Sequence, residues 1–351
     1  RLALALVALL ILSVTAFTTP AQPVLAQDLD FGEAINLSKT GNAIRNPEIA
    51  LSENNVYVTW TESFPFTSGT TRQCCMASIF FKSSYDSGSS WNNRLTLSDS
   101  VRDAIHEKIA ASDNNVYVVW INMMPTGNPT IFFRASNDNG ASFGNIINLH
   151  PDTNGADYPE IAASGNNVYV VWQTSGTAGN IFFARSTDRG ASFDAPIQMG
   201  DIWGEATFAK VIFEGSNVYV AWSERTTQEN LDVYFRASND YGITFGPIIN
   251  ISDNPAHAYN AEIAASGNNV YVVWQDFTNG NSEIYFRASS DSGSTFGSLT
   301  NLSNTAEWSE YTEIAASGSY VYVVWDDVTD VFFKTSSDNG ATFGDAINLS
   351  N

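Results

Sequence analysis

Residues 160–172 read Glu-Ile-Ala-Ala-Ser-Gly-Asn-Asn-Val-Tyr-Val-Val-Trp, and this block decides the fold because close copies of it occur six times along the chain. Each copy ends on a tryptophan, and these lie 50 to 60 residues apart: Trp60, Trp120, Trp172, Trp222, Trp274 and Trp325. Self-similarity at a fixed period of this length is the signature of solenoids, propellers and other repeat arrays. The 351 residues are therefore expected to form one repeat architecture rather than two or three unrelated domains.

Each repeat offers four short apolar runs, which we name strands a to d. Strand a is the run at 160–163, strand b the run at 168–172, strand c a run such as 131–135, and strand d a run such as 347–350. Gly, Asn, Asp and Ser cluster between the runs, as strand boundaries require. Strand b is apolar at successive positions, so both faces of its sheet must be covered, as in a propeller blade. The sequence therefore predicts an all-β, six-bladed β-propeller of four-stranded antiparallel blades, forming a single domain over residues 27–351.

One d-like segment is left over. Residues 31–38 resemble strand d but precede the first strand a. They would compete with 343–350 for the last blade or add a fifth strand to it. If the natural chain continued past Asn351 with another a-b-c set, seven blades would close. Six blades are the prediction.

The N-terminal residues have the character of a targeting segment. Arg1 precedes an apolar run at 2–17, and Val24-Leu25-Ala26 suits cleavage after Ala26. Residues 1–26 are predicted to be a signal peptide, with an uncleaved anchor as the alternative, and the mature chain is expected to be extracellular or at the cell surface without a membrane span. The two cysteines, Cys74 and Cys75, are adjacent; a vicinal disulfide, a bond between molecules and two free thiols all remain open.

The charge balance limits the classes of molecule that the chain is expected to bind. The chain carries 16 basic and 37 acidic residues, a formal net charge of −21. Phosphate backbones and anionic membranes are bound by clustered Lys and Arg, so nucleic acid and anionic membranes are poor partners. Neutral glycans, cations and extracellular proteins with cationic surfaces are expected instead.

A turn motif follows strand c in every repeat. Residues 136–143 read Ser-Asn-Asp-Asn-Gly-Ala-Ser-Phe, and the pattern Ser-x-Asp-x-Gly-x-Ser/Thr-Phe/Trp is intact six times, centred on Asp86, Asp138, Asp188, Asp240, Asp291 and Asp338. The carboxylate can accept hydrogen bonds from its own turn, and Gly permits a positive φ. This motif resembles the Asp box (BNR repeat) of sialidase-like propellers. The resemblance implies that these aspartates are structural and lie away from the face that binds substrate.

Residues that depart from the repeat indicate where a ligand would bind. The resemblance places a site on the end formed by the d-a and b-c loops. Aromatic rings stack on sugars and imidazoles add hydrogen bonds. We therefore predict a recognition face at this end, with packing between blades as the alternative, from residues in the d-a loops or just ahead of strand a: Trp203, Trp308, Tyr158, Tyr259, Tyr311, His106 and His257.

The first residue of strand a is charged in every repeat. The six residues are Glu48, Lys108, Glu160, Lys210, Glu262 and Glu313. Innermost strands line the channel of a propeller, so these side chains are expected to ring its mouth. Clustered carboxylates suit a calcium ion, with Glu48, Glu160, Glu262 and Glu313 as candidate ligands. Mutual Glu–Lys pairing is the alternative, and no other cofactor is expected.

The resemblance also implies a catalytic set, which the sequence does not support. Sialidases hold the substrate carboxylate with three arginines and use a Tyr nucleophile beside Glu. Arg45-Asn46-Pro47 is similar to the family's Arg-Ile-Pro motif, and Tyr311 with Glu310 or Glu313 resembles the nucleophile pair. No late-blade arginine completes the triad, because those outside repeat positions are Arg45, Arg72, Arg102 and Arg225. A different glycosidase would need two carboxylates at a fixed separation, from candidates such as Asp103, Asp157, Glu205 and Glu310.

The first functional expectation is therefore a secreted or cell-surface binding propeller that recognises a glycan or a protein. A glycoside hydrolase of the exo-sialidase type is the second. A structural component of a surface layer or filament is the third, and an exposed, unpaired edge at 31–38 would favour it.

Overall fold

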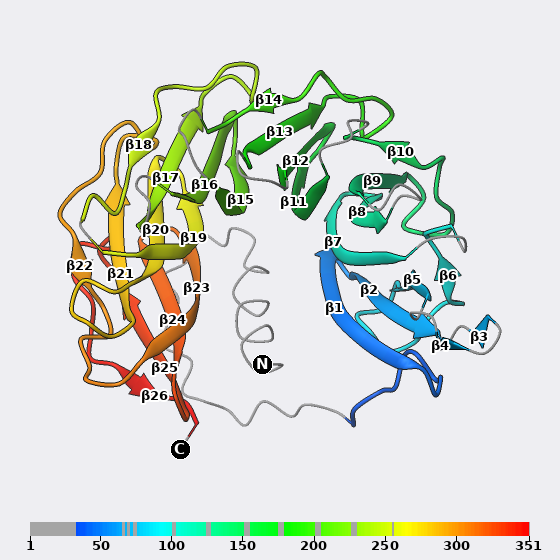
Figure 1. Ribbon diagram of the computed structural model, residues 1–351, viewed down its shortest axis with the longest axis horizontal. Helices are drawn as coiled ribbons and strands as arrows, with labels where there is room; N and C mark the ends of the chain where they lie inside the picture. Colours follow the sequence, from blue (N-terminus) through cyan, green and yellow to red (C-terminus); the bar gives the residue numbers. More distant parts are fainter. Residues whose placement is uncertain are drawn as a thin grey trace.

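The computed structural model describes residues 33–350 apart from short gaps at 65–66, 69–70, 73–75, 100–102, 124–127, 151–154, 175–178, 201–204, 226–229 and 255. The described residues form strands, turns and coil, and contain no helix. Six four-stranded antiparallel sheets stand around a central axis (Figure 1). The prediction of an all-β, six-bladed propeller with four-stranded antiparallel blades is confirmed.

Each blade is built in the order a, b, c, d from the axis outward (Figure 1). Blade 1 consists of β1 (Ala43–Ser52), β2 (Asn55–Phe64), β5 (Met76–Ser84) and β6 (Leu95–Thr96), with a side hairpin of β3 (Thr67–Ser68) and β4 (Thr71–Arg72). Blade 2 consists of β7 (Ala104–Ser112), β8 (Asn115–Met123), β9 (Pro129–Ser136) and β10 (Ile147–Asn148). Blade 3 consists of β11 (Ala156–Ser164), β12 (Asn167–Thr174), β13 (Ile181–Ser186) and β14 (Ile197–Gln198).

The remaining three blades repeat this plan. Blade 4 consists of β15 (Ala206–Glu214), β16 (Asn217–Arg225), β17 (Leu231–Ser238) and β18 (Ile249–Asn250). Blade 5 consists of β19 (Ala258–Ser266), β20 (Asn269–Asp276), β21 (Glu283–Ser289) and β22 (Thr300–Asn301). Blade 6 consists of β23 (Ser309–Ser317), β24 (Tyr320–Asp327), β25 (Asp330–Ser336) and β26 (Ile347–Asn348).

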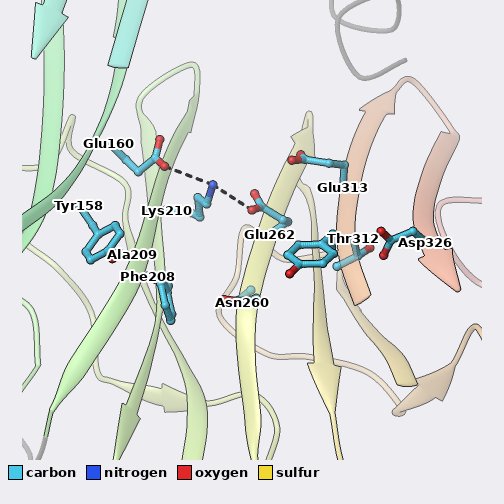
Figure 2. A pocket seen from close by; sticks show the side chains of 12 residues that line it. Tyr158, Glu160, Phe208, Ala209, Lys210, Asn260, Glu262, Thr312, Glu313 and Asp326 are labelled. Carbon is cyan, nitrogen blue, oxygen red and sulfur yellow. Dashed lines mark ion pairs between the residues drawn. The ribbon is translucent and has the colours of Figure 1, made fainter. Parts of the chain in front are cut away.

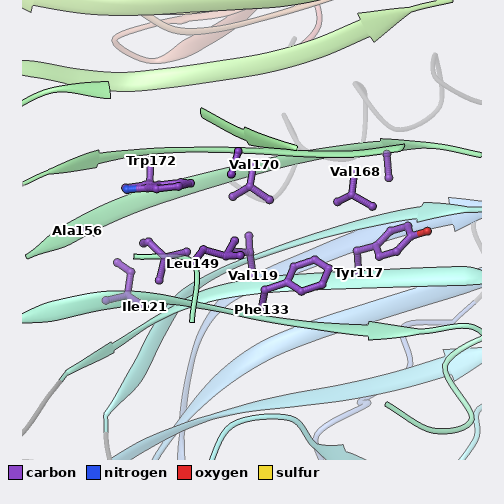
Figure 3. Close-up of a cluster of buried hydrophobic side chains, with 12 residues drawn as sticks. Tyr117, Val119, Ile121, Phe133, Leu149, Ala156, Val168, Val170 and Trp172 are labelled. Carbon is purple, nitrogen blue, oxygen red and sulfur yellow. The ribbon is translucent and has the colours of Figure 1, made fainter. Parts of the chain in front are cut away.

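The hydrophobic core lies between neighbouring blades. Figure 3 shows Tyr117, Phe133 and Leu149 of blade 2 facing Val168 and Trp172 of blade 3. All five side chains are at most 5% exposed. Burying an aliphatic or aromatic side chain of this size contributes about 1.5–3 kcal/mol, so the interfaces between thin sheets supply most of the stability. This is why strand b is apolar at successive positions.

The Asp boxes hold the turns between strands c and d. Asp138 accepts hydrogen bonds from the Ser142 amide (2.9 Å) and hydroxyl (2.6 Å), and the Ser136 hydroxyl donates to it (2.7 Å). The same bonds recur in the other five boxes. The amide of the residue after each aspartate donates to the a-b turn of its own blade, as Asn139 does to Asn114 (2.9 Å). The aspartates therefore lie at the end of the molecule opposite the start of strand a.

Strand a begins earlier than its sequence pattern indicated. Its first residues pair with strand b, and a β-bulge then shifts the register, as between Asp157 and Glu160 in β11. His106, Tyr158, Tyr259 and Tyr311 consequently lie within strand a, so their assignment to loops ahead of it was wrong. A bulge leaves residues outside the hydrogen-bonded ladder. The residues before it therefore do not continue the apolar run from which strand a was predicted.

Successive inner strands contact each other from β1 through β7, β11, β15 and β19 to β23. In the described part of the chain no comparable contact joins β23 to β1, and blades 6 and 1 face each other across the open side of the ring (Figure 1). Residues 33–38 form no strand, so β26 alone serves as strand d of blade 6. The predicted signal peptide at 1–26, Cys74 and Cys75 lie outside the described residues. Within those residues no helix is long and apolar enough to cross a membrane.

Candidate functional site

The bulge in strand a places one side chain per blade at the channel mouth. The bulged residue has a positive φ, between 47° and 54°, in all six blades. Positive φ is easily adopted by Asn but is unfavourable for bulky aromatic residues. The six residues are Asn46, His106, Tyr158, Phe208, Asn260 and Tyr311. Three blades therefore carry a large aromatic ring at a backbone position that suits asparagine better.

Neighbouring bulge residues contact each other across blades. His106 stacks on Tyr158 with ring centroids 5.2 Å apart, and Tyr158 meets Phe208 edge-on at 5.6 Å. We call these three rings the aromatic arc. Tyr158 is 43% exposed and Phe208 39%, so both offer ring surface to the solvent. His106 Nδ1 also lies 3.0 Å from Asp157 Oδ1, which orients the imidazole.

A cavity of about 570 Å³ opens beside the arc. Its walls come from blades 3 to 6 and include Tyr158, Phe208, Asn260 and Tyr311 together with Glu160, Lys210, Glu262, Glu313 and Asp326. In Figure 2, Tyr158 and Phe208 lie on one side of the cavity and Glu313 and Asp326 on the other. Tyr311 is 51% exposed. The cavity therefore combines aromatic faces with several carboxylates and one ammonium group.

Behind the bulge, the charged residue of each strand a joins a line of ion pairs that we call the channel charge chain. Lys108 Nζ lies 2.9 Å from Glu48 and 3.4 Å from Glu160. Lys210 Nζ lies 3.3 Å from Glu160 and 2.9 Å from Glu262 (Figure 2). Glu313 continues the line on blade 6. The expected ring of charges therefore exists, and the two lysines pair with three of its four glutamates.

The pairing sets different pKa values along the chain. Burial opposes ionisation of Glu160, but Lys210 and Lys108 outweigh it and lower its pKa. Burial raises the pKa of Glu262 to about 8, against the attraction of Lys210 and with added repulsion from Glu313. Burial likewise raises the pKa of Glu313. Glu160 therefore ionises more readily than Glu262, although both carboxyl groups contact Lys210.

Calcium finds little support in this arrangement. Three of the candidate ligands, Glu48, Glu160 and Glu262, are engaged by lysines. In the described ranges no group of three or more His, Cys, Asp or Glu side chains is arranged to hold a metal ion. The mutual Glu–Lys pairing explains these residues.

A second aromatic cluster lies outside the cavity. Tyr259 stacks on Phe277 at 5.6 Å, and Phe277 meets Trp308 edge-on at 5.6 Å. Trp308 is 49% exposed. Tyr259 lies one residue ahead of the bulge, so it does not join Tyr158 and Tyr311 in the cavity lining. His257 is exposed, and its Nδ1 accepts a hydrogen bond from the Leu231 amide (3.3 Å); Trp203 lies outside the described residues.

The catalytic set of a sialidase is not assembled in the described residues. Arg45 is exposed on the bulge of blade 1, and Arg225 on blade 4 pairs with Glu205 at 3.3 Å. Arg102 and the side chain of Arg72 lie outside what the structure describes. The cavity lining contains no arginine. Tyr311 and Glu313 both line the cavity, whereas Glu310 is not part of that lining.

The other candidate carboxylates serve nearby groups. Asp103 accepts a hydrogen bond from the Ala77 amide (2.9 Å), and Asp157 contacts His106. Phe208 was missed by the sequence analysis, as were Asn260 and Asp326. The signal was present for the first two: each stands two residues before the charged residue of strand a, as Tyr158 and Tyr311 do. Once the bulge is known, that offset identifies the residue whose side chain faces the channel mouth.

Comparison with known proteins identifies the fold. No family model and no curated protein matches the chain in sequence. An ulvan lyase of polysaccharide lyase family PL25 is 12% identical with a TM-score of 0.58, over 88% of this chain and 85% of that one. An α-L-arabinofuranosidase from Fusarium graminearum is 12% identical with a TM-score of 0.51, over 70% and 80%.

A Hadza microbial sialidase is 15% identical with a TM-score of 0.48, and the chain covers 66% of its length, less than two thirds. At these identities the likeness concerns the fold. The chain therefore shares its propeller fold with the ulvan lyase and the arabinofuranosidase, and six Asp boxes hold its c-d turns.

Proposed function

We propose that this chain is an extracellular binding propeller that takes a glycan at the channel mouth, with sugar rings stacked on the aromatic arc and on Tyr311. The observation that carries the proposal is the conformation of the bulge. Holding a large aromatic residue at positive φ is unfavourable by roughly 1–3 kcal/mol. Tyr158, Phe208 and Tyr311 accept this conformation and are 39–51% exposed.

Packing of the scaffold does not account for these rings. Blades 1 and 5 have Asn46 and Asn260 at the same position, with the same backbone conformation. The bulge therefore forms without an aromatic residue. Backbone strain at exposed aromatic residues beside a cavity is the pattern expected of a binding site.

The charges favour a neutral or amino sugar as the ligand. The channel charge chain has four carboxyl groups and two ammonium groups, and both lysines are already engaged by glutamates. An anionic sugar would need a free cation. Hydroxyl groups, by contrast, can donate to the carboxylate oxygens of Glu160 without needing a free cation. The chain's acidic surplus also supports this choice.

The test is a screen of the purified chain on an array of neutral, amino and anionic oligosaccharides, followed by titration calorimetry with the best binder. The triple variant Tyr158→Asn/Phe208→Asn/Tyr311→Asn copies the residue of blades 1 and 5, so it should fold. The proposal expects it to lose at least about tenfold in affinity, or about 1.4 kcal/mol. Unchanged affinity, or no binder on the array, would remove the proposal.

A matched control exists at the opposite end of the molecule. Tyr241 in the fourth Asp box also has positive φ (60°) and is 47% exposed. Asn139 and Asn339 occupy the same position in the second and sixth boxes, with φ of 59°. Tyr241→Asn is therefore the same chemical change in the same conformation, and it should leave glycan binding unchanged.

Glycoside hydrolysis is the second candidate, and one observation favours it. Burial raises the pKa of Glu262 to about 8, and other carboxyl groups line the same cavity. A protonated carboxyl beside an ionised one is the acid–base arrangement of glycosidases. Release of nitrophenol from aryl glycosides, abolished by Glu262→Gln, would support hydrolysis. Binding without turnover would support the binding function alone.

A further inference from the structure

One contact repeats at every formed interface between blades. The central phenylalanine of strand c packs into the Asp box of the next blade, as Phe133 does against Gly190 and Phe193. A Cβ at Gly190 would lie 2.6 Å from the Phe133 ring, so only glycine fits. The same contact joins Phe81, Phe183, Phe235 and Phe286 to Gly140, Gly242, Gly293 and Gly340. These five phenylalanines are at most 1% exposed.

The sixth contact is not made. Phe333 of blade 6 is only partly buried, and a Cβ at Gly88 in the first Asp box would meet only Trp91 of its own turn, at 4.0 Å. Strand d shows the same break: Leu302 is 1% exposed but Leu349 is 46% exposed. Ile49 and Leu51 on β1 are also 36% exposed. Blades 6 and 1 therefore present interface surfaces of the repeat type with nothing in the described residues to cover them.

Residues 36–39 form the same turn that follows strand d in blades 4 and 5. The Lys39 amide donates to Asn36 Oδ1 (3.0 Å), as Asp253 does to Asn250 (2.9 Å) and Asn304 to Asn301 (3.0 Å). Lys39, Asp253 and Asn304 share a positive φ of 43–49°. In blades 4 and 5, strand c pairs with the equivalent segment, which is strand d of its own blade. Residues 33–38 carry the strand d sequence pattern and this turn but pair with no described strand.

We propose that the open side of the ring takes a seventh unit of this repeat, entering after β26 with its own strands a, b and c and completed by residues 33–38 as its strand d. Its strand c phenylalanine would pack against Gly88 and Trp91, and its Asp box would receive Phe333. Every exposed surface named above then acquires the partner that its equivalents have in the other blades.

The channel charge chain specifies one residue of this unit. Carboxylates alternate with lysines from Glu48 to Glu262, but Glu313 makes no ion pair in the described part of the chain, and Glu48 has a lysine on one side only. Glu313 and Glu48 flank the open side, and their mutual repulsion is smaller than the attraction of Lys210 and Lys108 for Glu313. A basic residue after the bulge of the new strand a, at the position of Lys210, would pair with both.

The same charges argue against a second copy of this chain as the occupant. Its blade 1 would bring another Glu48 beside Glu313, adding a carboxylate where a cation is required. In a second copy, blade 1 is already covered by blade 2, so blade 2 would stand where blade 1 of the first copy needs a partner. A single blade with a lysine fits both the charge and the repeat.

The experiment appends a copy of residues 201–244, which carries strands a to c and the lysine of blade 4, after Asn351 of the full chain. The matched control is the same copy with Glu in place of that lysine. Burial of one more interface on each side should raise Tm by at least about 5 °C. The copy that carries the lysine should raise Tm more than the copy that carries the glutamate. No rise in Tm with either copy overturns the proposal.

Thiol labelling tests closure directly in a Cys74→Ser/Cys75→Ser background. Leu349→Cys should react with a maleimide quickly in the unextended chain and at least tenfold more slowly once the lysine copy is appended. Leu302→Cys should be protected in both. If Leu349→Cys is already as protected as Leu302→Cys in the unextended monomer, six blades close on themselves and the proposal fails. If it is protected only in a dimer, a second copy is the occupant and the proposal is replaced.

Discussion

The ring of Tyr158 stands edge-on to the ring of Phe208, with centroids 5.6 Å apart, although the two residues belong to different blades and neither is buried. Both occupy the bulged position of strand a with positive φ. In the propeller, residues at the same position of successive repeats lie next to each other around the channel. Variation at that one position therefore creates a continuous aromatic surface on an otherwise regular scaffold.

The bulge should be more stable with asparagine than with an aromatic residue. Replacing Tyr158 or Phe208 with Asn relieves an unfavourable conformation, which offsets the loss of the buried part of each ring, so Tm should stay within about 2 °C of the parent or rise. Differential scanning calorimetry measures this. A drop of more than about 5 °C would mean that the rings pack as part of the scaffold, and the functional argument from the bulge would be lost.

Truncating the strand c phenylalanine should have very different effects in blades 2 and 6. Phe133 is fully buried against Gly190, so Phe133→Ala should destabilise the protein by about 3–5 kcal/mol. Phe333 lies on the open side, and Phe333→Ala should have less than half of that effect. Urea unfolding of the two variants measures the difference. Equal losses would show that blade 6 packs against blade 1 in solution.

Acid should destabilise the Asp boxes in a defined range. The Thr244 hydroxyl and amide hold the pKa of Asp240 at about 2, and Thr295 does the same for Asp291. Because the folded pKa lies below the ordinary value of about 4, ionisation favours the folded state above pH 4. This contribution is lost as the pH falls towards 2. Thermal unfolding between pH 5 and pH 2 should show the loss, and Asp240→Asn should lower Tm at pH 7 while reducing the drop below pH 4.

Glu262 should give the opposite dependence at higher pH. Its folded pKa of about 8 exceeds the unfolded value, so the folded state holds more protons between about pH 4.5 and pH 8. Stability contributed by the protonated form is therefore lost as the pH rises through 8. In Glu262→Gln the decline of Tm from pH 5 to pH 8.5 should be smaller than in the parent. An identical decline in both proteins would contradict the raised pKa.

The repeat made most of the fold predictable. The tryptophans that end strand b, from Trp60 to Trp325, mark each blade, and the Asp boxes mark each c-d turn. Both signals are local, because a buried strand needs apolar residues on both faces and a tight turn needs Asp and Gly at fixed offsets. The ring of charges was also predictable, since Glu48 and its equivalents recur at one position of strand a.

The binding surface was less predictable because a bulge has no strong sequence signature. Tyr158 and Tyr311 were selected for their chemistry, but Phe208 was not, since its position relative to Lys210 matters only once the bulge is known. Tyr259 looked equivalent to Tyr158 and is offset by one residue. The break between blades 6 and 1 was visible as the extra segment at 31–38, yet only the exposure of Leu349 and Phe333 gives it physical meaning.

The central claim is that the bulged aromatic residues bind a glycan, and calorimetric titration of one oligosaccharide into two matched variants tests it most directly. The account predicts that Tyr241→Asn binds like the parent and that Tyr158→Asn/Phe208→Asn/Tyr311→Asn binds at least about tenfold more weakly, with both variants folded. Equal affinities for the parent and the triple variant would contradict it.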